Sequence, residues 1–133
     1  MTLYLDSSAL VKRYVAEEGS DEIVRAMDEA DAWSSCRLTF VETVRAVGLR
    51  AGSKGAGRVK DDWRNIDVIE LDCGLAERAA EVALSTGLRA LDAVHLAAAL
   101  SAPEKSPLFA TWDIRLHRAA RVQGLRTLPV ALG

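Results

Sequence analysis

The chain opens with a short apolar run that ends in an acid. Residues 3–5 are Leu-Tyr-Leu, Asp6 follows them, and an apolar pattern with helical spacing comes next. This order predicts a buried strand over 3–6 and a short helix over 8–15. Because ligands bind at the carboxyl ends of the strands in an open parallel sheet, Asp6 is the first candidate for a functional residue.

The rest of the chain alternates between short apolar runs and longer amphipathic stretches. Further strands are predicted at 32–35, 68–71, 108–111 and 125–128. Helices are predicted at 21–30, from 37 or 39 to 51, and at 57–65, 73–86, 91–100 and 113–123. The alternation predicts an α/β fold with a central parallel sheet of four to five strands, flanked by helices on both faces.

Two segments between these elements are predicted to be irregular. The stretch 52–57 is rich in glycine, but it does not match the phosphate-binding loop motif and it follows a helix rather than a strand. We therefore expect a flexible turn there. The stretch 102–107, which contains two prolines, is expected to be a surface loop.

Length and composition indicate one globular domain over 1–133, with 50% hydrophobic residues. The net charge of −2 argues against a generally basic nucleic-acid coat, while a local basic patch is compatible with it. Cys36 and Cys73 form no zinc motif, so we expect reduced thiols in a cytoplasmic protein. The sequence has no apolar run long enough to span a membrane and no visible export signal.

Four acids stand out from their surroundings: Asp6, Glu42, Asp92 and Asp113. Each has a structural explanation, because each lies at or near a predicted helix start, where a carboxylate caps free amide groups. Glu42 also fits a capping box with Thr39. Taken one at a time, the capping interpretation is favoured for each of them.

Taken together, the four acids indicate a metal centre. Asp6 and Asp113 follow predicted strands, so both project from the carboxyl edge of the same sheet. Asp92 and Glu42 have apolar neighbours, among which a carboxylate is costly unless it is paired or binds a cation. Carboxylate oxygens without histidine or cysteine ligands suit Mg²⁺ or Mn²⁺. Such a centre can activate water for attack on a phosphate ester.

Four blocks of sequence, in their order, resemble the PIN domain, and within it the VapC-type ribonuclease toxins of bacterial toxin–antitoxin pairs. The blocks are Asp6-Ser7-Ser8-Ala9-Leu10, the helix around Glu42, Leu91-Asp92-Ala93-Val94-His95-Leu96-Ala97, and Thr111-Trp112-Asp113. Their order and spacing are specific, and the resemblance covers the whole chain.

The resemblance implies an endoribonuclease that depends on Mg²⁺ or Mn²⁺. It implies a catalytic and metal-binding cluster made of Asp6, Glu42, Asp92 and Asp113. By this resemblance Asp6 and Asp92 bind the metal directly and Asp113 binds it through water. Glu42 binds the metal or orients the nucleophile.

The resemblance also implies what the protein contacts. Ser7 and Thr111 stand where the family has hydroxyl residues, and together with Arg115 they are candidates for substrate binding. The expected partners are an RNA substrate, a small antitoxin protein and a second copy of the chain. The apolar stripes of the predicted helices 8–15 and 21–30 are candidate surfaces for the protein contacts.

Other chemistry-bearing residues have weaker signals. Arg115, Arg118 and Arg121 share a broad face of the predicted helix 113–123, which suits RNA phosphates, although a solvated helix surface explains them equally well. His95 lies three residues after Asp92 on the same helical face. His95 could approach a phosphate or act as an acid. We favour a packed helix residue that is hydrogen-bonded to its surroundings and is not essential for turnover.

Rival families lack their signatures here. A receiver-like domain needs an adjacent acid pair after the first strand, and a haloacid-dehalogenase-type phosphatase needs a second acid where Ser8 stands. A dinucleotide-binding domain needs a glycine-rich motif after that strand. The alternative that stays open is a catalytically silent PIN-like module that binds RNA or protein.

Overall fold

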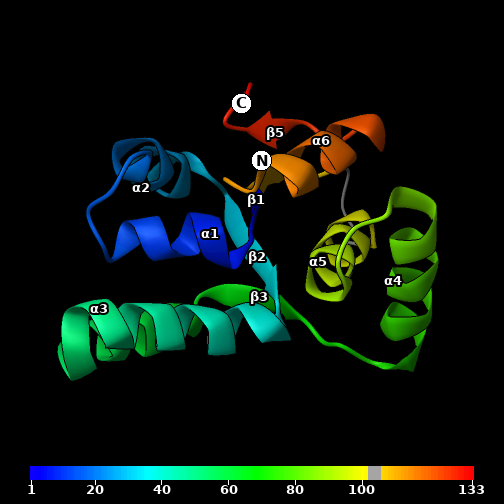
Figure 1. Cartoon of the computed structure of the whole chain (residues 1–133). Coiled ribbons are helices and arrows are strands. Elements are labelled where there is room, and N and C mark those ends of the chain that lie inside the picture. The colour runs from blue at the N-terminus through cyan, green and yellow to red at the C-terminus, as the bar shows by residue number, and fades with distance from the viewer. Residues whose placement is uncertain (102–105) are drawn as a thin grey trace.

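The computed structural model describes residues 1–101 and 106–133, so the predicted loop at 102–107 lies mostly outside the described residues. In this part of the chain one parallel sheet contains β1 (Thr2–Leu5), β2 (Ala32–Cys36), β3 (Ile66–Ile69), β4 (Leu108–Ala110) and β5 (Thr127–Leu128). The strand order is β3-β2-β1-β4-β5, which places β1 in the centre (Figure 1). The predicted parallel α/β sheet is confirmed.

Helices cover both faces of the sheet, as predicted (Figure 1). One face carries α1 (Ser7–Leu10), the 3₁₀ turn η1 (Val11–Arg13), α2 (Ser20–Glu29) and α3 (Arg37–Trp63). The other face carries α4 (Cys73–Thr86), α5 (Ala90–Leu100) and α6 (Ile114–Val122). In the described residues no helix is both long and apolar enough to cross a membrane.

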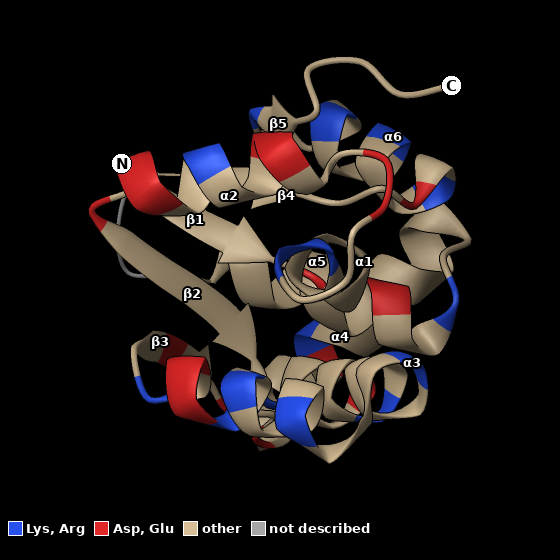
Figure 2. Ribbon diagram, turned by 90° about the vertical axis from the view of Figure 1, so that its left-hand side faces the viewer, with Lys and Arg blue, Asp and Glu red and all other residues tan. Residues whose placement is uncertain are grey.

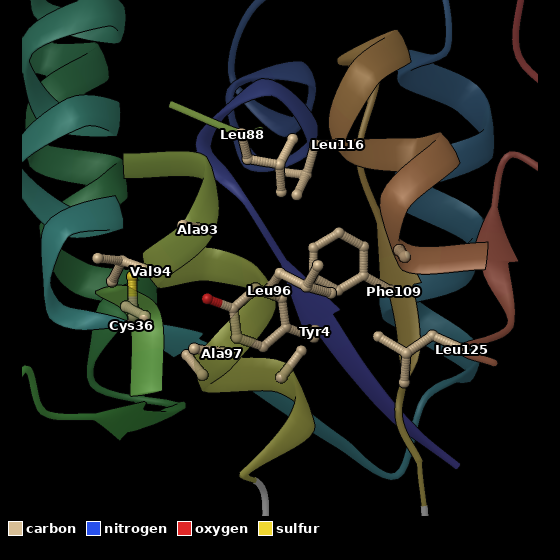
Figure 3. Packing of buried hydrophobic residues seen from close by; sticks show 14 of the residues in the cluster. Tyr4, Cys36, Leu88, Ala93, Val94, Leu96, Ala97, Phe109, Leu116 and Leu125 are labelled. Carbon is tan, nitrogen blue, oxygen red and sulfur yellow. The ribbon is translucent and has the colours of Figure 1, made fainter. Parts of the chain in front are cut away.

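The central strand β1 divides the core into two halves. Leu3 and Leu5 pack with α1, α2 and α3, whereas Tyr4 packs with α4, α5 and α6, and all three side chains are fully buried. Successive side chains of a strand point to opposite faces, so this division follows from the sequence of β1. On the second face the Tyr4 ring stacks on Phe109, with ring centroids 5.2 Å apart (Figure 3).

The predicted break between two helices is present at Gly52, but the predicted flexible turn over 52–57 is too long, because residues 53–57 are helical and α3 is assigned through to Trp63. The non-helical residue inside α3 is Gly52, with φ 70° and ψ −169°, and it marks a kink. Gly55 is buried beyond the kink, and a Cβ at this position would lie only 2.8 Å from the Cβ of Ala51. The glycine at 55 therefore permits close packing of the two halves of α3.

Smaller differences concern element ends. β3 occupies 66–69 rather than 68–71, and the predicted helix 8–15 is a single turn of α-helix followed by η1. The last strand is at the sheet edge, as predicted, but spans only 127–128. The paired strands β1 and β4 end side by side, since Leu5 is in register with Ala110. This juxtaposition places the segments after both strands next to each other.

Candidate active site

Asp6 follows the central strand β1 and is only 4% exposed. Its Oδ1 accepts hydrogen bonds from the Ala9 amide (2.9 Å) and the Ser8 hydroxyl (2.7 Å). Its Oδ2 accepts one from the Thr111 hydroxyl at 2.5 Å. Asp6 is therefore the N-cap of α1, as the capping interpretation predicts. Burial raises the pKa of this carboxyl, although the charge of His95 and these hydrogen bonds act in the opposite direction.

Hydrogen bonds of two hydroxyl groups link the segment after β4 to Asp6. Thr111 Oγ1 also accepts a hydrogen bond from the Asp113 amide (3.1 Å), and Ser8 Oγ accepts one from the Trp112 amide (2.9 Å). Ser8 was missed by the sequence reasoning, which chose its neighbour Ser7. The available signal was the position of Ser8 two residues after a capping acid, from which a short hydroxyl side chain reaches back to the cap.

The predicted residue Ser7 is placed differently. It is half-buried at the start of α1, and its hydroxyl makes no hydrogen bond with any described residue. Thr111, by contrast, is fully buried. The structure thus brings the Thr111 hydroxyl to Asp6 and leaves the Ser7 hydroxyl unengaged by the described residues.

Asp113 follows β4 and caps α6. Its Oδ1 accepts a hydrogen bond from the Leu116 amide at 2.9 Å, and the residue is half-buried. The capping interpretation therefore also holds for Asp113. Because β1 and β4 are neighbours, the two strand-end acids lie at the same edge of the sheet, as the sequence predicted.

Asp92 has no capping role. The N-cap of α5 is Arg89, and the half-buried Asp92 carboxylate makes no hydrogen bond or ion pair with any described residue. Burial raises the pKa of Asp92, and the negative charges of Asp113 and Asp6 raise it further, against the opposite effects of His95 and Arg89. Asp92 therefore faces two other acids without a compensating hydrogen bond from the described residues.

Glu42 does not form the predicted capping box. The helix begins at Arg37, so Thr39 already lies inside α3, and Glu42 instead contacts His95 across the site. The distance from Glu42 Oε1 to His95 Nε2 is 3.2 Å, and the Glu42 side chain is 31% exposed. The fourth acid thus reaches the site from α3 and is paired with a histidine.

His95 is buried and hydrogen-bonded to its surroundings, as predicted. Burial lowers the pKa of His95, while its hydrogen bonds with Cys36 and Glu42 raise it more strongly, to about 10. The charge of His95 in turn lowers the pKa values of Asp6 and Asp92. Its contact with Glu42, 53 residues away, has no local sequence signal.

The donor chemistry fits a hard divalent cation. All four candidate ligands are carboxylates, and the mutual repulsion of Asp92, Asp113 and Asp6 is the kind that a bound cation relieves. In the ranges 1–101 and 106–133, however, no three His, Cys, Asp or Glu side chains lie close enough together to hold a metal ion. The residue types therefore suit Mg²⁺ or Mn²⁺, while a preformed coordination site is absent from the described residues.

Two basic side chains on α6 lie beyond Asp113. Arg115 and Arg118 are exposed and, with residues 85–88, line a surface pocket of about 450 Å³. Figure 2 shows the basic segments of α6 in blue. Neither guanidinium makes an ion pair with a described residue. Arg121 differs from them, because it donates a hydrogen bond to the Val130 carbonyl.

Other basic residues near the first turn are already paired. Lys12 and Arg50 both form ion pairs with Glu17, and Arg13 forms one with Asp62. The Lys12 ammonium also lies over the Trp112 ring, 4.9 Å from its centroid. These contacts make Arg115 and Arg118 the better candidates for holding an anionic ligand.

Comparisons with known proteins identify the family. The PIN domain model matches residues 3–122. The chain is 38% identical over 128 residues to Ribonuclease VapC35 of Mycobacterium tuberculosis, covering 92% of this chain and 93% of that protein. It is 32% identical over 139 residues to Ribonuclease VapC45 of the same species, covering 98% and 96%. A solved toxin–antitoxin complex from Klebsiella pneumoniae matches with a TM-score of 0.68 and 16% identity, covering 85% and 87%. The chain belongs to the PIN domain family.

Proposed function

We propose that this chain is a Mg²⁺- or Mn²⁺-dependent endoribonuclease and the toxin of a type II toxin–antitoxin pair. The observation that carries the proposal is the environment of Asp92, which is repelled by Asp113 and Asp6 and makes no hydrogen bond or ion pair with a described residue. An acid kept in such a place is costly for folding, which favours a functional role. The full-length similarity to proteins named ribonucleases supports RNA as the substrate.

The proposed roles of the residues follow from their contacts. The metal would be held by Asp6, Asp92, Asp113 and Glu42. When bound, the ion supplies Lewis acidity for hydrolysis of a phosphodiester. Thr111 and Ser8 orient the Asp6 carboxylate by hydrogen bonds, so they are positioning residues in this proposal. Burial of Thr111 makes direct contact with RNA a poor fit for its hydroxyl.

The first test compares wild type with Asp92→Asn on a pool of structured RNA, with Mn²⁺ and with EDTA. We expect metal-dependent cleavage by wild type and a loss of about 100-fold or more in the variant, because the cation that would stabilise the charge of the transition state loses one of its proposed ligands. Asp28→Asn is the matched control, because Asp28 is exposed on α2. Equal cleavage by Asp92→Asn and wild type would contradict the proposal.

The same test addresses the silent-module alternative. Stabilisation by Mn²⁺ without cleavage of any RNA would favour a binding module. Circular dichroism of each variant would show that differences in cleavage do not arise from unfolding. Cleavage that persists in EDTA would contradict the metal requirement and leave the proposed nuclease activity standing.

Arg115 and Ser7 are the proposed substrate contacts, joined by Arg118 because it lines the same pocket as Arg115. We expect Arg115→Gln or Arg118→Gln to weaken RNA binding. Each variant should also reduce the slope of log K against log salt by about 1 if the arginine neutralises one RNA phosphate. Arg25→Gln on α2 is the control, since Arg25 is exposed and has no ion-pair partner among the described residues. Unchanged slopes would remove these arginines from the proposed binding surface.

A small antitoxin partner is also part of the proposal, and the match to a solved toxin–antitoxin complex supports it. A homodimer is proposed with it, from the family resemblance alone. The surfaces that the sequence suggested are wrong, however. The apolar side chains on α1, η1 and α2 are mostly buried in the monomer, including Leu10 and Ile23. Light scattering on the purified chain, alone and with its antitoxin, tests both contacts. A monomer that does not change size would contradict them.

A further inference from the structure

The structure gives His95 two well-defined polar contacts inside the protein. The residue lies on α5, one turn after Asp92, and is 2% exposed. Its Nε2 is 3.2 Å from Glu42 Oε1, and its Nδ1 is 3.0 Å from the Tyr4 hydroxyl oxygen. Cys36 Sγ lies 3.6 Å from the same Nδ1 atom. Both ring nitrogens are therefore engaged.

The contact between His95 and Glu42 has only one possible direction. An ionised carboxylate accepts hydrogen bonds and cannot donate them, so the hydrogen must be on Nε2. This holds for the neutral ring and for the charged ring. The orienting effect of His95 on Glu42 thus follows from geometry and does not depend on the protonation state of the ring.

Tyr4 fixes the ring from the core. It is fully buried, its ring is stacked on Phe109 with an interplanar angle of 6°, and its hydroxyl points away from that stack (Figure 3). Tyr4 is in β1, two residues before Asp6. The strand that leads into Asp6 therefore also contacts His95, which in turn contacts Glu42.

Glu42 needs such support more than the strand-end acids do. Asp6 and Asp113 are held by helix-capping hydrogen bonds, whereas the Glu42 carboxylate has no partner among the described residues besides His95. A partly exposed glutamate has several rotamers, and holding one of them costs conformational entropy. A buried, doubly anchored donor reduces that cost.

We propose that His95 is a positioning residue that holds the Glu42 carboxylate at the acidic cluster and ties it to β1 through Tyr4. This inference rests on the proposed function, because it takes Glu42 to be part of the nuclease site. It replaces the sequence-based expectation that His95 is dispensable.

The test compares His95→Leu with His95→Gln. Leucine removes the donor, whereas the glutamine amide nitrogen can still donate to Glu42. We expect kcat to fall about 10- to 100-fold in His95→Leu with little change in KM, as for residues that orient metal ligands. His95→Gln should restore kcat to within a few-fold of wild type. Equal losses in the two variants would overturn the proposal.

A double-mutant cycle with Glu42→Gln distinguishes positioning from general structural damage. If His95 acts through Glu42, adding His95→Leu to Glu42→Gln should cost little more than Glu42→Gln alone. Fully additive losses would overturn the proposal. If His95→Leu does not fold, Tyr4→Phe replaces it in the cycle, because that change removes the hydroxyl and keeps the stacked ring.

His117→Leu is the matched control. His117 is also a buried histidine, and its Nε2 contacts the Pro129 carbonyl oxygen rather than a site acid. Removal of this buried hydrogen bond should lower the Tm and leave kcat unchanged. An equal fall in kcat for His117→Leu would show that any buried histidine has this effect and would overturn the assignment to His95.

The Mn²⁺ dissociation constant, measured without RNA, separates this proposal from the nuclease proposal. If wild type cleaves no RNA but binds Mn²⁺, the same cycle is run on this constant. A 10- to 100-fold weakening in His95→Leu, with recovery in His95→Gln, then supports positioning although the nuclease proposal has failed. Unchanged Mn²⁺ affinity in His95→Leu overturns it. A wild type that neither cleaves RNA nor binds Mn²⁺ overturns both.

Discussion

The four candidate acids are of two kinds. The strand-end acids, Asp6 and Asp113, each cap a helix and so belong to the framework of the fold. The helix-borne acids, Asp92 and Glu42, cap nothing: one has no hydrogen-bond partner among the described residues and the other contacts His95. The same local pattern, an acid near a helix start, therefore covers two physical situations.

The difference shows which acids carry information about function. A capping acid is explained by the stability it adds, whether or not it also binds a ligand. Burial and the charges of Asp113 and Asp6 raise the pKa of Asp92, so its ionised form is disfavoured in the folded chain, although the charges of His95 and Arg89 act in the opposite direction. An acid that the fold does not need is the stronger indication of a site.

The largest expected effect is on the stability that a bound metal adds, which should depend on Asp92. At a Mn²⁺ concentration about 100 times the dissociation constant, wild type should gain about 2.7 kcal/mol in the free energy of unfolding. Asp92→Asn should lose most of this gain, and the exposed control Asp28→Asn should keep it. Thermal denaturation with Mn²⁺ and with EDTA measures the effect. A gain that survives in Asp92→Asn would place the ion elsewhere.

Alanine at the two kinds of position should then act in opposite directions on stability. Asp6→Ala removes the cap of α1 and the acceptor of the Ala9 amide, and it leaves the Thr111 hydroxyl with the longer contact to Ser8 Oγ at 3.4 Å. We expect a loss of about 2 kcal/mol in the free energy of unfolding. Asp92→Ala in the absence of metal should leave stability unchanged or raise it. Urea denaturation in EDTA measures both free energies of unfolding. Equal losses in Asp6→Ala and Asp92→Ala would contradict the distinction between the two kinds of acid.

Substitutions of Asp113 can separate its role as the cap of α6 from its proposed role in RNA cleavage. Asp113→Ala should cost about 1 kcal/mol of stability by removing the cap of α6, whereas Asp113→Asn should cost little because asparagine caps about as well. Both variants should reduce RNA cleavage, since both remove a negative charge from the site. Cleavage by Asp113→Asn at the wild-type rate would leave Asp113 with a capping role only.

The smallest expected effect is a pH dependence in the absence of metal. The folded state holds the Asp92 proton more tightly than the unfolded state does, because the pKa of Asp92 is raised above its ordinary value of 3.8. Asp92 therefore makes wild type lose stability as the pH rises between these two pKa values. Asp92→Asn lacks this contribution, so its advantage over wild type should grow over that range. Urea titrations in EDTA at several pH values measure it, and parallel curves would contradict the raised pKa.

Much of this arrangement was predictable from local pattern. The strand before Asp6, the cap at Asp113 and the alternation of strands and helices all depend on neighbouring residues. These features placed both acids at the same sheet edge. β1 and β4 are parallel neighbours with Leu5 in register with Ala110, so the segments that carry Asp6 and Asp113 begin side by side. This is the edge at which ligands bind in open parallel sheets.

What the sequence reasoning missed depends on contacts between distant residues. Gly55 looked like part of a flexible turn, but its lack of a side chain permits packing inside α3. The pairing of His95 with Glu42 joins α5 to α3, and no spacing rule links them. Hydrophobic periodicity reports which face of an element is buried, but it does not report which polar groups meet across that face.

The hydrogen bond from Thr111 to Asp6 has a consequence for the timing of activity during protein synthesis. The two residues are 105 positions apart, and ribosomes add about 5–20 residues per second, so roughly 5–20 s separate their synthesis. Until β4 has been made and has paired with β1, Asp6 lacks this donor and Asp113 is absent from the sheet edge. Under the proposed function, a nascent chain is therefore harmless to the RNA of the ribosome that makes it for most of its own translation.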